Sequence, residues 1–185
     1  MEAFEHIVKV YLESQGYIVT TNVKFPVRIR TKKAKYPEYQ THGYEVDIVG
    51  AKSNSLLLGS VKSFFGSSGV NRQGFKGIAD ASKKTYFDRY KIFNEPEIRK
   101  AIVEDVKKKY GYSSGQIQFC LFVGKFNKSD EDSIIQYLNE VQVKVYDLKT
   151  VMRHLIEASK SNTYIDDPVI VTLKALRQVG FLLEG

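Results

Sequence analysis

The stretch 44–62 places an aspartate and a lysine where a short hairpin would bring them together. It reads Tyr-Glu-Val-Asp-Ile-Val-Gly, then the polar turn Ala-Lys-Ser-Asn-Ser, then Leu-Leu-Leu-Gly-Ser-Val-Lys. Asp47 lies inside the first apolar run and Lys62 ends the second. Because burial of an unpaired carboxylate is costly, Asp47 needs a partner. The pair is typical either of a salt bridge across two strands or of a site in which the acid holds a divalent cation and the lysine activates a water.

The second interpretation requires more oxygen ligands than Asp47 alone provides. Mg²⁺ is usually bound by one or two carboxylates and several waters, and Mn²⁺ accepts the same kind of ligands. We expect the backbone carbonyl of Val61 to supply a second oxygen, and Glu5 to supply a third, directly or through a water. The ion would lower the pKa of a water, Lys62 would orient or deprotonate that water, and both would offset the charge of a phosphate.

A helix is predicted at the start of the chain, where it would carry Glu5. Apolar residues at positions 4, 7, 8, 11 and 12 recur with the spacing of one helix face, and Gly16 is placed to end the helix. Glu5 follows Phe4 by about 100° around the helix, so it borders the buried face. If this helix covers the sheet, Glu5 can point toward the hairpin.

The strands are predicted from β-branched and aromatic residues. The stretch 17–23 predicts a first strand, and the two apolar runs of 44–62 predict the second and third. The stretch 24–43 between them contains two prolines and many basic residues. We interpret it mainly as a basic loop, with room for a short strand at 27–29.

The rest of the chain alternates between helical and strand patterns. Further strands are predicted at 116–124 and 141–146, and further helices at 75–93, 95–110, 129–138, 148–158 and 166–183. This order predicts one α/β domain with its core at about 2–155 and a C-terminal helix packed on it. The sheet is expected to be mixed, with about five strands that begin as an antiparallel meander, and to be flanked by helices on both faces.

The formal net charge of +7 is concentrated on either side of the hairpin. The stretch 24–35 holds six basic residues and no acid. Such clusters favour a polyanionic partner, although a generic basic surface has the same composition. The candidate nucleic-acid contacts are Lys24, Arg28, Arg30, Lys32, Lys33, Lys35, Arg72 and Lys76.

Other classes of protein are disfavoured by composition. No apolar run approaches 18 residues, so no membrane span is expected. The N-terminus begins with an acid and lacks the apolar region of a signal peptide. The single cysteine, Cys120, excludes an internal disulfide and is expected to be a small core residue. A cytoplasmic location is therefore the default expectation.

The hairpin resembles the PD-(D/E)xK nuclease superfamily, in which an acid on one core strand is followed on the next strand by an acid, any residue and a lysine. The first acid corresponds here to Asp47, and the last two positions to Val61 and Lys62. A closer resemblance, to the Mrr-like restriction endonuclease group, is carried by Phe4-Glu5, Gly16-Tyr17, Glu45-Val46-Asp47-Ile48 and Gly59-Ser60-Val61-Lys62. The resemblance covers roughly 2–155. It implies a restriction-endonuclease-like three-layer core. The implied activity is that of a Mg²⁺-dependent endonuclease that acts on DNA in restriction or repair. An RNA target and a homodimer both remain open alternatives.

Ser60 departs from the pattern of that superfamily, because it stands where an acid is usual. A serine hydroxyl has no charge to offer a metal ion. Glu45 lies two residues before Asp47 and should project to the same side of its strand, so either Glu45 or Glu5 would restore the missing carboxylate. The resemblance thus implies Asp47, Lys62, Glu45 and Ser60 as catalytic positions and Asp47, Glu5 and Val61 as metal ligands.

Three functions follow from these patterns. The first is the metal-dependent endonuclease. The second is a non-catalytic nucleic-acid-binding module on a degenerate nuclease fold, which the serine at position 60 favours. The third is a protein-interaction subunit whose charge serves only solubility, and the clustering of the charge argues against it.

Overall fold

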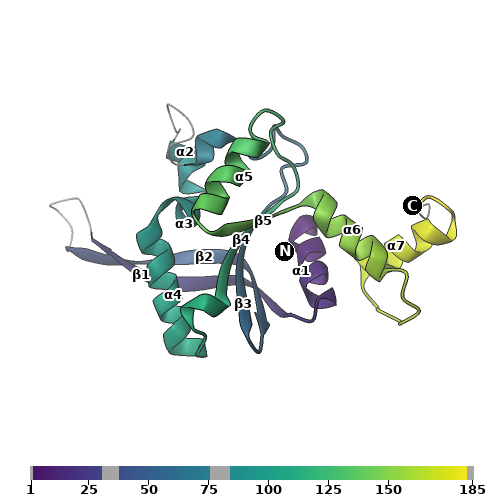
Figure 1. Cartoon of the computed structure of the whole chain (residues 1–185), viewed down its shortest axis with the longest axis horizontal. Coiled ribbons are helices and arrows are strands. Elements are labelled where there is room, and N and C mark those ends of the chain that lie inside the picture. The colour runs from purple at the N-terminus through teal and green to yellow at the C-terminus, as the bar shows by residue number, and fades with distance from the viewer. Residues whose placement is uncertain (1, 31–37, 76–83, 183–185) are drawn as a thin grey trace.

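A computed structural model describes residues 2–30, 38–75 and 84–182 of the protein. The strands in these ranges are β1 (Ile18–Arg30), β2 (Tyr39–Lys52), β3 (Ser55–Lys62), β4 (Ile117–Val123) and β5 (Val143–Asp147). The α-helices are α1 (Ala3–Ser14), α2 (Lys84–Asp88), α3 (Lys91–Asn94), α4 (Pro96–Tyr110), α5 (Glu131–Glu140), α6 (Leu148–Ala158) and α7 (Pro168–Gln178). Figure 1 shows the sheet at the centre with helices packed around it.

The strands form one mixed sheet in the order β1-β2-β3-β4-β5. The pairs β1–β2 and β2–β3 are antiparallel, and the pairs β3–β4 and β4–β5 are parallel. The predicted α/β fold, with a mixed sheet of five strands flanked by helices, is therefore confirmed. No helix in the described ranges is both long enough and apolar enough to cross a membrane.

The helices cover both faces of the sheet, which gives three layers. Residues of α4 and α5 pack on one face, and residues of α1, α6 and α7 pack on the other. The neighbouring residues Leu121 and Phe122 of β4 lie in these two different clusters, so β4 is buried on both faces. Cys120 is buried in the same strand, and burial raises the pKa of its thiol, as expected for a small core residue.

The helix ends follow from local sequence. Gly16 has φ +82°, a left-handed conformation that glycine adopts at little cost, and the chain turns there from α1 toward β1. The side chain of Asp147 accepts a hydrogen bond from Thr150 N at 2.7 Å and caps α6, whose bounds match the predicted 148–158. The C-terminal helix, α7, is shorter than the predicted 166–183.

The prediction of a basic loop at 24–43 is wrong for its described part. The strand β1 continues to Arg30 and β2 begins at Tyr39, so the two strands form a long hairpin (Figure 1). Apolar and basic residues alternate here, with Phe25 and Val27 buried and Arg28 exposed, which is the pattern of a strand with one covered face. The proline at position 26 is tolerated because β1 is an edge strand.

The predicted helix at 75–93 is also only partly correct. Residues 76–83 lie outside the described ranges, and the part that follows forms two short helices, α2 and α3, instead of one long helix. Asn94 at the end of α3 donates a hydrogen bond to the carbonyl of Gly74 at 2.8 Å, which ties this region to the segment after β3.

Candidate active site

Asp47 lies where the β2–β3 ladder ends. The pairing runs from Lys52–Ser55 to Ile48–Gly59 and stops there. Beyond it, Asp47 Oδ2 accepts a hydrogen bond from Val61 N at 2.6 Å. A side-chain carboxylate thus takes over the role of a backbone acceptor at the point where the two strands separate.

Two further donors converge on the same oxygen of Asp47. The hydroxyl of Ser60 donates at 2.8 Å and the ammonium of Lys62 donates at 3.0 Å. The side chains of Asp47 and Lys62 are 19% and 21% exposed, so their ion pair is shielded from solvent but reachable. The predicted contact between this acid and this lysine is therefore present, and no described residue forms a hydrogen bond or ion pair with Asp47 Oδ1.

A bend in both strands puts Asp47 in this position. The β1–β2 ladder pairs Thr21 with Ile48 and Val23 with Val46, but the residues between them, Asn22 and Asp47, are not paired. Asn22 has φ +56°, a conformation that asparagine tolerates better than most residues. Val46 and Ile48 consequently pack into opposite cores although they lie two residues apart.

The backbone carbonyl of Val61 faces the same gap as the Asp47 carboxylate. Lys62 O accepts a hydrogen bond from Gly124 N at 2.8 Å, so the backbone of Lys62 faces β4. Successive residues of a strand direct their N–H and C=O groups to opposite edges, and both groups of one residue share an edge. The N–H of Val61 points at Asp47, and the carbonyl of Val61 therefore lies on that side as well.

A cavity of about 660 Å³ opens over this pair. Its lining comes from α1 and its N-cap, the middle of β2, the end of β3, the loop after β3 and the turn before α3: Glu2, Glu5, Asp47, Val61, Lys62, Ser63, Phe64, Phe65, Gly66, Ser67 and Arg89. The helix α1 thus brings Glu5 to the hairpin, as the sequence predicted. Glu5 also accepts a hydrogen bond from Glu2 N at 3.1 Å, which closes a capping box at the start of α1.

The loop after β3 forms one wall of the cavity in a strained conformation. Phe64 has φ +47°, which costs a residue other than glycine roughly 1–3 kcal/mol. The next residue, Phe65, packs edge-on against Phe4 of α1, with 5.4 Å between ring centroids. This contact holds the loop against the helix that carries Glu5.

Glu45 does not reach the cavity. It lies on the exposed side of β2, where its carboxylate pairs with Lys24 of β1 at 3.6 Å. The chain bends between Glu45 and Asp47, so the two side chains do not converge as they would on a straight strand. Within the described residues, the carboxylates that line the cavity beside Asp47 are those of Glu2 and Glu5.

The residues predicted to contact nucleic acid lie in different environments. Arg28 and Arg30 are exposed on β1, with the Arg28 guanidinium 4.7 Å from the Tyr39 ring centroid and Arg30 paired with Glu38 at 3.2 Å. The predicted contacts that lie outside the described ranges are Lys32, Lys33, Lys35 and Lys76.

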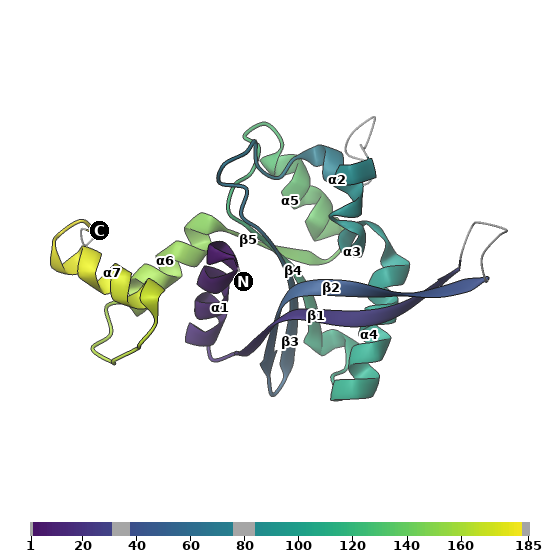
Figure 2. The ribbon, with the colours of Figure 1, turned by 180° about the vertical axis from the view of Figure 1, so that it is seen from behind.

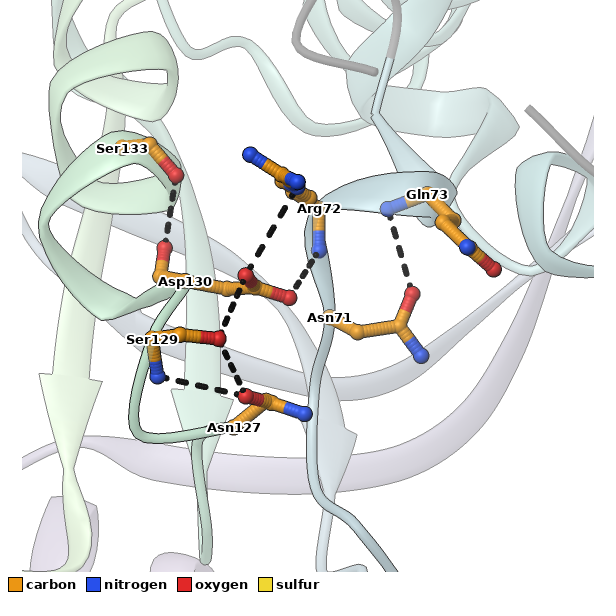
Figure 3. A network of polar contacts seen from close by, with 7 residues as sticks. All are labelled: Asn71, Arg72, Gln73, Asn127, Ser129, Asp130 and Ser133. Atoms are coloured by element: carbon orange, nitrogen blue, oxygen red, sulfur yellow. Dashed lines mark hydrogen bonds and ion pairs between the residues drawn. The ribbon is translucent and has the colours of Figure 1, made fainter. Parts of the chain in front are cut away.

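Arg72 belongs to a separate polar network (Figure 3). Its backbone N–H donates to Asp130 Oδ2 at 3.1 Å, and its Nε lies 3.7 Å from Asp130 Oδ1. Asp130 also accepts from the Ser129 hydroxyl at 3.1 Å. The network joins the segment after β3 to the start of α5, and the Arg72 side chain remains 57% exposed.

Two charged residues of the cavity, Glu2 and Arg89, were not predicted from the sequence. Glu2 precedes the apolar pattern of α1, and Arg89 lies far from the hairpin in sequence and in no motif. The guanidinium of Arg89 lies 5.5 Å from the ring centroid of Tyr86. No ion pair of Arg89 is found among the described residues, whereas Lys62 is already paired with Asp47.

The donor set of the cavity fits Mg²⁺ but is not a preformed cage. Nowhere in the described ranges do three or more His, Cys, Asp or Glu side chains gather as a metal-binding group. Mg²⁺ needs only one or two carboxylates together with waters. The protein can supply this set of oxygen ligands from Asp47 Oδ1, the carbonyl of Val61 and the carboxylate of Glu5.

The fold and the cavity define an α/β protein with an acid–lysine pair at the open end of a strand hairpin. No protein-family model matches the chain, and no curated protein matches it either. Among solved structures, the chain is similar to a crystal structure described as a protein of unknown function, AF1548. The identity is 18% and the TM-score 0.41, over 96% of this chain and 77% of that one. A similarity this low carries no argument about function.

Proposed function

We propose that this protein is a Mg²⁺-dependent endonuclease that hydrolyses phosphodiester bonds in DNA, on a fold of the PD-(D/E)xK type. The observation that carries the proposal is the convergence of Lys62 and the backbone of Val61 on Asp47 at the end of the β2–β3 ladder. That convergence lies in a cavity that also receives Glu5 and Arg89. A salt bridge with a purely structural role would not require the second carboxylate or the second cation.

In this proposal Asp47, Glu5 and the Val61 carbonyl hold the metal ion. Bound Mg²⁺ lowers the pKa of a water and offsets the charge of the phosphate. Oδ2 of Asp47 accepts from three donors, and Oδ1, which has no hydrogen bond among the described residues, would bind the ion. Glu5 approaches from α1, whose capping box and contact with Phe65 fix the start of that helix.

Lys62 and Ser60 have different roles. Lys62 Nζ stands beside Asp47 in the cavity, where it stabilises the charge that develops on the phosphate and orients the attacking water. Ser60 directs its hydroxyl at Asp47, so it acts as a positioning residue for that carboxylate. The superfamily's usual second carboxylate is supplied by Glu5, because Glu45 is engaged with Lys24 away from the cavity.

A plasmid-nicking assay with Mg²⁺ or Mn²⁺ tests this function. Asp47→Asn and Lys62→Ala should each lower the rate about 100-fold or more, and chelation of the metal should abolish it. Lys100→Ala is the matched control, because Lys100 is an exposed cation on α4 with no ion pair among the described residues. Nicking that persists in both site variants would remove the mechanism.

The alternative function is a non-catalytic nucleic-acid-binding module. Ser60 in the place of an acid, together with the outward position of Glu45, favours it. In that case the pair of Asp47 and Lys62 serves only the fold. DNA binding would then depend on salt, ignore Mg²⁺ and survive Asp47→Asn, and no preparation would nick the plasmid.

A further inference from the structure

The strands β1 and β2 extend beyond the rest of the sheet as a two-stranded arm. Their pairing continues from Val23–Val46 to Arg30–Tyr39, which is eight consecutive rows. The pairing of β2 with β3 stops at Ile48–Gly59, before the arm begins. Figures 1 and 2 show the arm projecting from the body of the protein on the side away from α6 and α7.

One face of the arm is covered by α4, and the other face is exposed to solvent. Phe25 and Val27 are buried in the core that contains Ile98 and Ile102 of α4. Figure 2 shows the opposite face in front of α4, on the same side as α1. The residues of this outer face are all exposed: Lys24, Pro26, Arg28 and Arg30 of β1, and Tyr39, Thr41, Gly43 and Glu45 of β2.

The cations of the outer face are held loosely. Lys24 and Glu45 are 69% and 45% exposed in their ion pair, and Arg30 and Glu38 are 73% and 62% exposed in theirs. Exposed ion pairs of this kind are weak, so a phosphate can displace the acid. Arg28 has no carboxylate partner among the described residues, and its guanidinium lies over the Tyr39 ring.

The strand that carries the outer face continues into the cavity. The outer-face residues of β2 end at Glu45, and beyond the bend the same strand places Asp47 in the cavity lining. At a rise of about 3.3 Å per residue, the eight positions from Tyr39 to Asp47 span about 26 Å. A B-form duplex rises about 3.4 Å per base pair, so this length corresponds to about eight base pairs.

We infer that the outer face of the arm binds double-stranded DNA along about eight base pairs on one side of the cut. The inference rests on the proposed function and names its substrate class. A two-stranded β-ribbon fits the major groove of B-form DNA, whereas the major groove of A-form RNA is too deep and narrow for side chains. Single-stranded binding relies on exposed aromatic rings, and among the described outer-face residues the aromatic one, Tyr39, already stacks with Arg28.

The test measures the affinity of the full chain, without metal, for a 30-base-pair DNA duplex, by fluorescence anisotropy over a range of salt concentrations. Arg28→Ala/Arg30→Ala should weaken binding at least about 10-fold and reduce the slope of log K against log salt by about two. The control is Lys100→Ala/Lys108→Ala, which removes the same charge from α4 and should leave the slope unchanged. Circular dichroism confirms that both double variants fold.

The competing ligands and the substrate length complete the test. Single-stranded DNA and duplex RNA of the same sequence should bind at least about 10-fold more weakly than the DNA duplex. With cleavable duplexes, shortening one flank below about eight base pairs should slow nicking. Equal binding of the three nucleic acids, or an arm variant that matches the α4 control, would overturn the inference. Arm-dependent binding without any nicking would instead overturn the proposed nuclease activity and still support DNA binding by the arm.

Discussion

Ser60→Ala isolates the role of the residue that departs from the nuclease pattern. The change removes one hydroxyl that donates to Asp47 Oδ2 at 2.8 Å and leaves Cβ in place. The donors Val61 N and Lys62 Nζ remain on the same oxygen. The carboxylate therefore stays in the cavity but loses one of the bonds that fix its direction.

The expected magnitude follows from the burial of the pair. A hydrogen bond to a charged group contributes about 1.5–3 kcal/mol, and partial exposure of Asp47 moves the value to the lower end, near 1.5 kcal/mol. For a chain of this size each kcal/mol shifts the melting temperature by about 2–4 °C, so Ser60→Ala should lower it by roughly 3–6 °C. Loss of a supporting partner of a metal ligand typically costs about 10–100-fold, so nicking at limiting Mg²⁺ should fall by about 10-fold.

Thermal unfolding and Mg²⁺-dependent nicking of the same preparations provide the assay. Ser60→Thr should recover both quantities, because threonine keeps a hydroxyl and suits a strand. Ser53→Ala, in the exposed turn between β2 and β3, is the control and should change neither. A Ser60→Ala protein with an unchanged melting temperature and an unchanged Mg²⁺ dependence of nicking would refute the positioning role of Ser60.

Three further changes probe the rest of the site. Arg89→Ala should raise KM for DNA about 10-fold with little change in kcat, since this guanidinium lines the cavity without an ion pair in the described residues, and steady-state kinetics should show Arg89→Lys to be intermediate. Glu5→Gln keeps an acceptor for the capping box but removes the charge, so the Mg²⁺ concentration for half-maximal nicking should rise about 10-fold while the melting temperature stays within about 2 °C. Gly59→Ala should lower the free energy of unfolding by about 1–3 kcal/mol in urea, because an added Cβ would lie 2.7 Å from Ile48 Cγ2, whereas Gly66→Ala meets no atom within 4 Å and should be nearly neutral.

Regular patterns in the sequence were sufficient where local chemistry decides the structure. The bounds of α6 were predicted because Asp147 is a strong N-cap immediately before an amphipathic run. The hairpin of β2 and β3 was predicted because two apolar runs flank a polar turn. The contact between Asp47 and Lys62 followed from that hairpin alone.

The arm was not predicted because its signals conflict. Pro26 and the basic residues suggested a loop, whereas the alternation of Phe25 and Val27 with exposed residues is that of a strand. Tertiary packing decides the structure here, because α4 covers one face of the β1–β2 arm and β1, as an edge strand, accommodates the proline. Neither condition is visible in the local sequence.

The composition of the site was predictable only in part for a related reason. The expectation that Glu45 and Asp47 share a side assumed a straight strand, and the left-handed residue Asn22 marks a bend beside Asp47. Arg89 enters the cavity through the packing of the segment before α3, which no spacing in the sequence specifies. Glu5 was found because helix periodicity places it at the border of a buried face.

A crystal structure of the protein soaked with Mn²⁺ tests the metal site most directly, because the anomalous signal of the ion locates it. We expect one peak in the cavity within bonding distance of Asp47 Oδ1 and the Val61 carbonyl, with Glu5 as a direct or water-mediated ligand, and no peak in Asp47→Asn. A saturated soak with no peak at Asp47 would contradict the proposed metal site and leave the contact with Lys62 as a structural salt bridge.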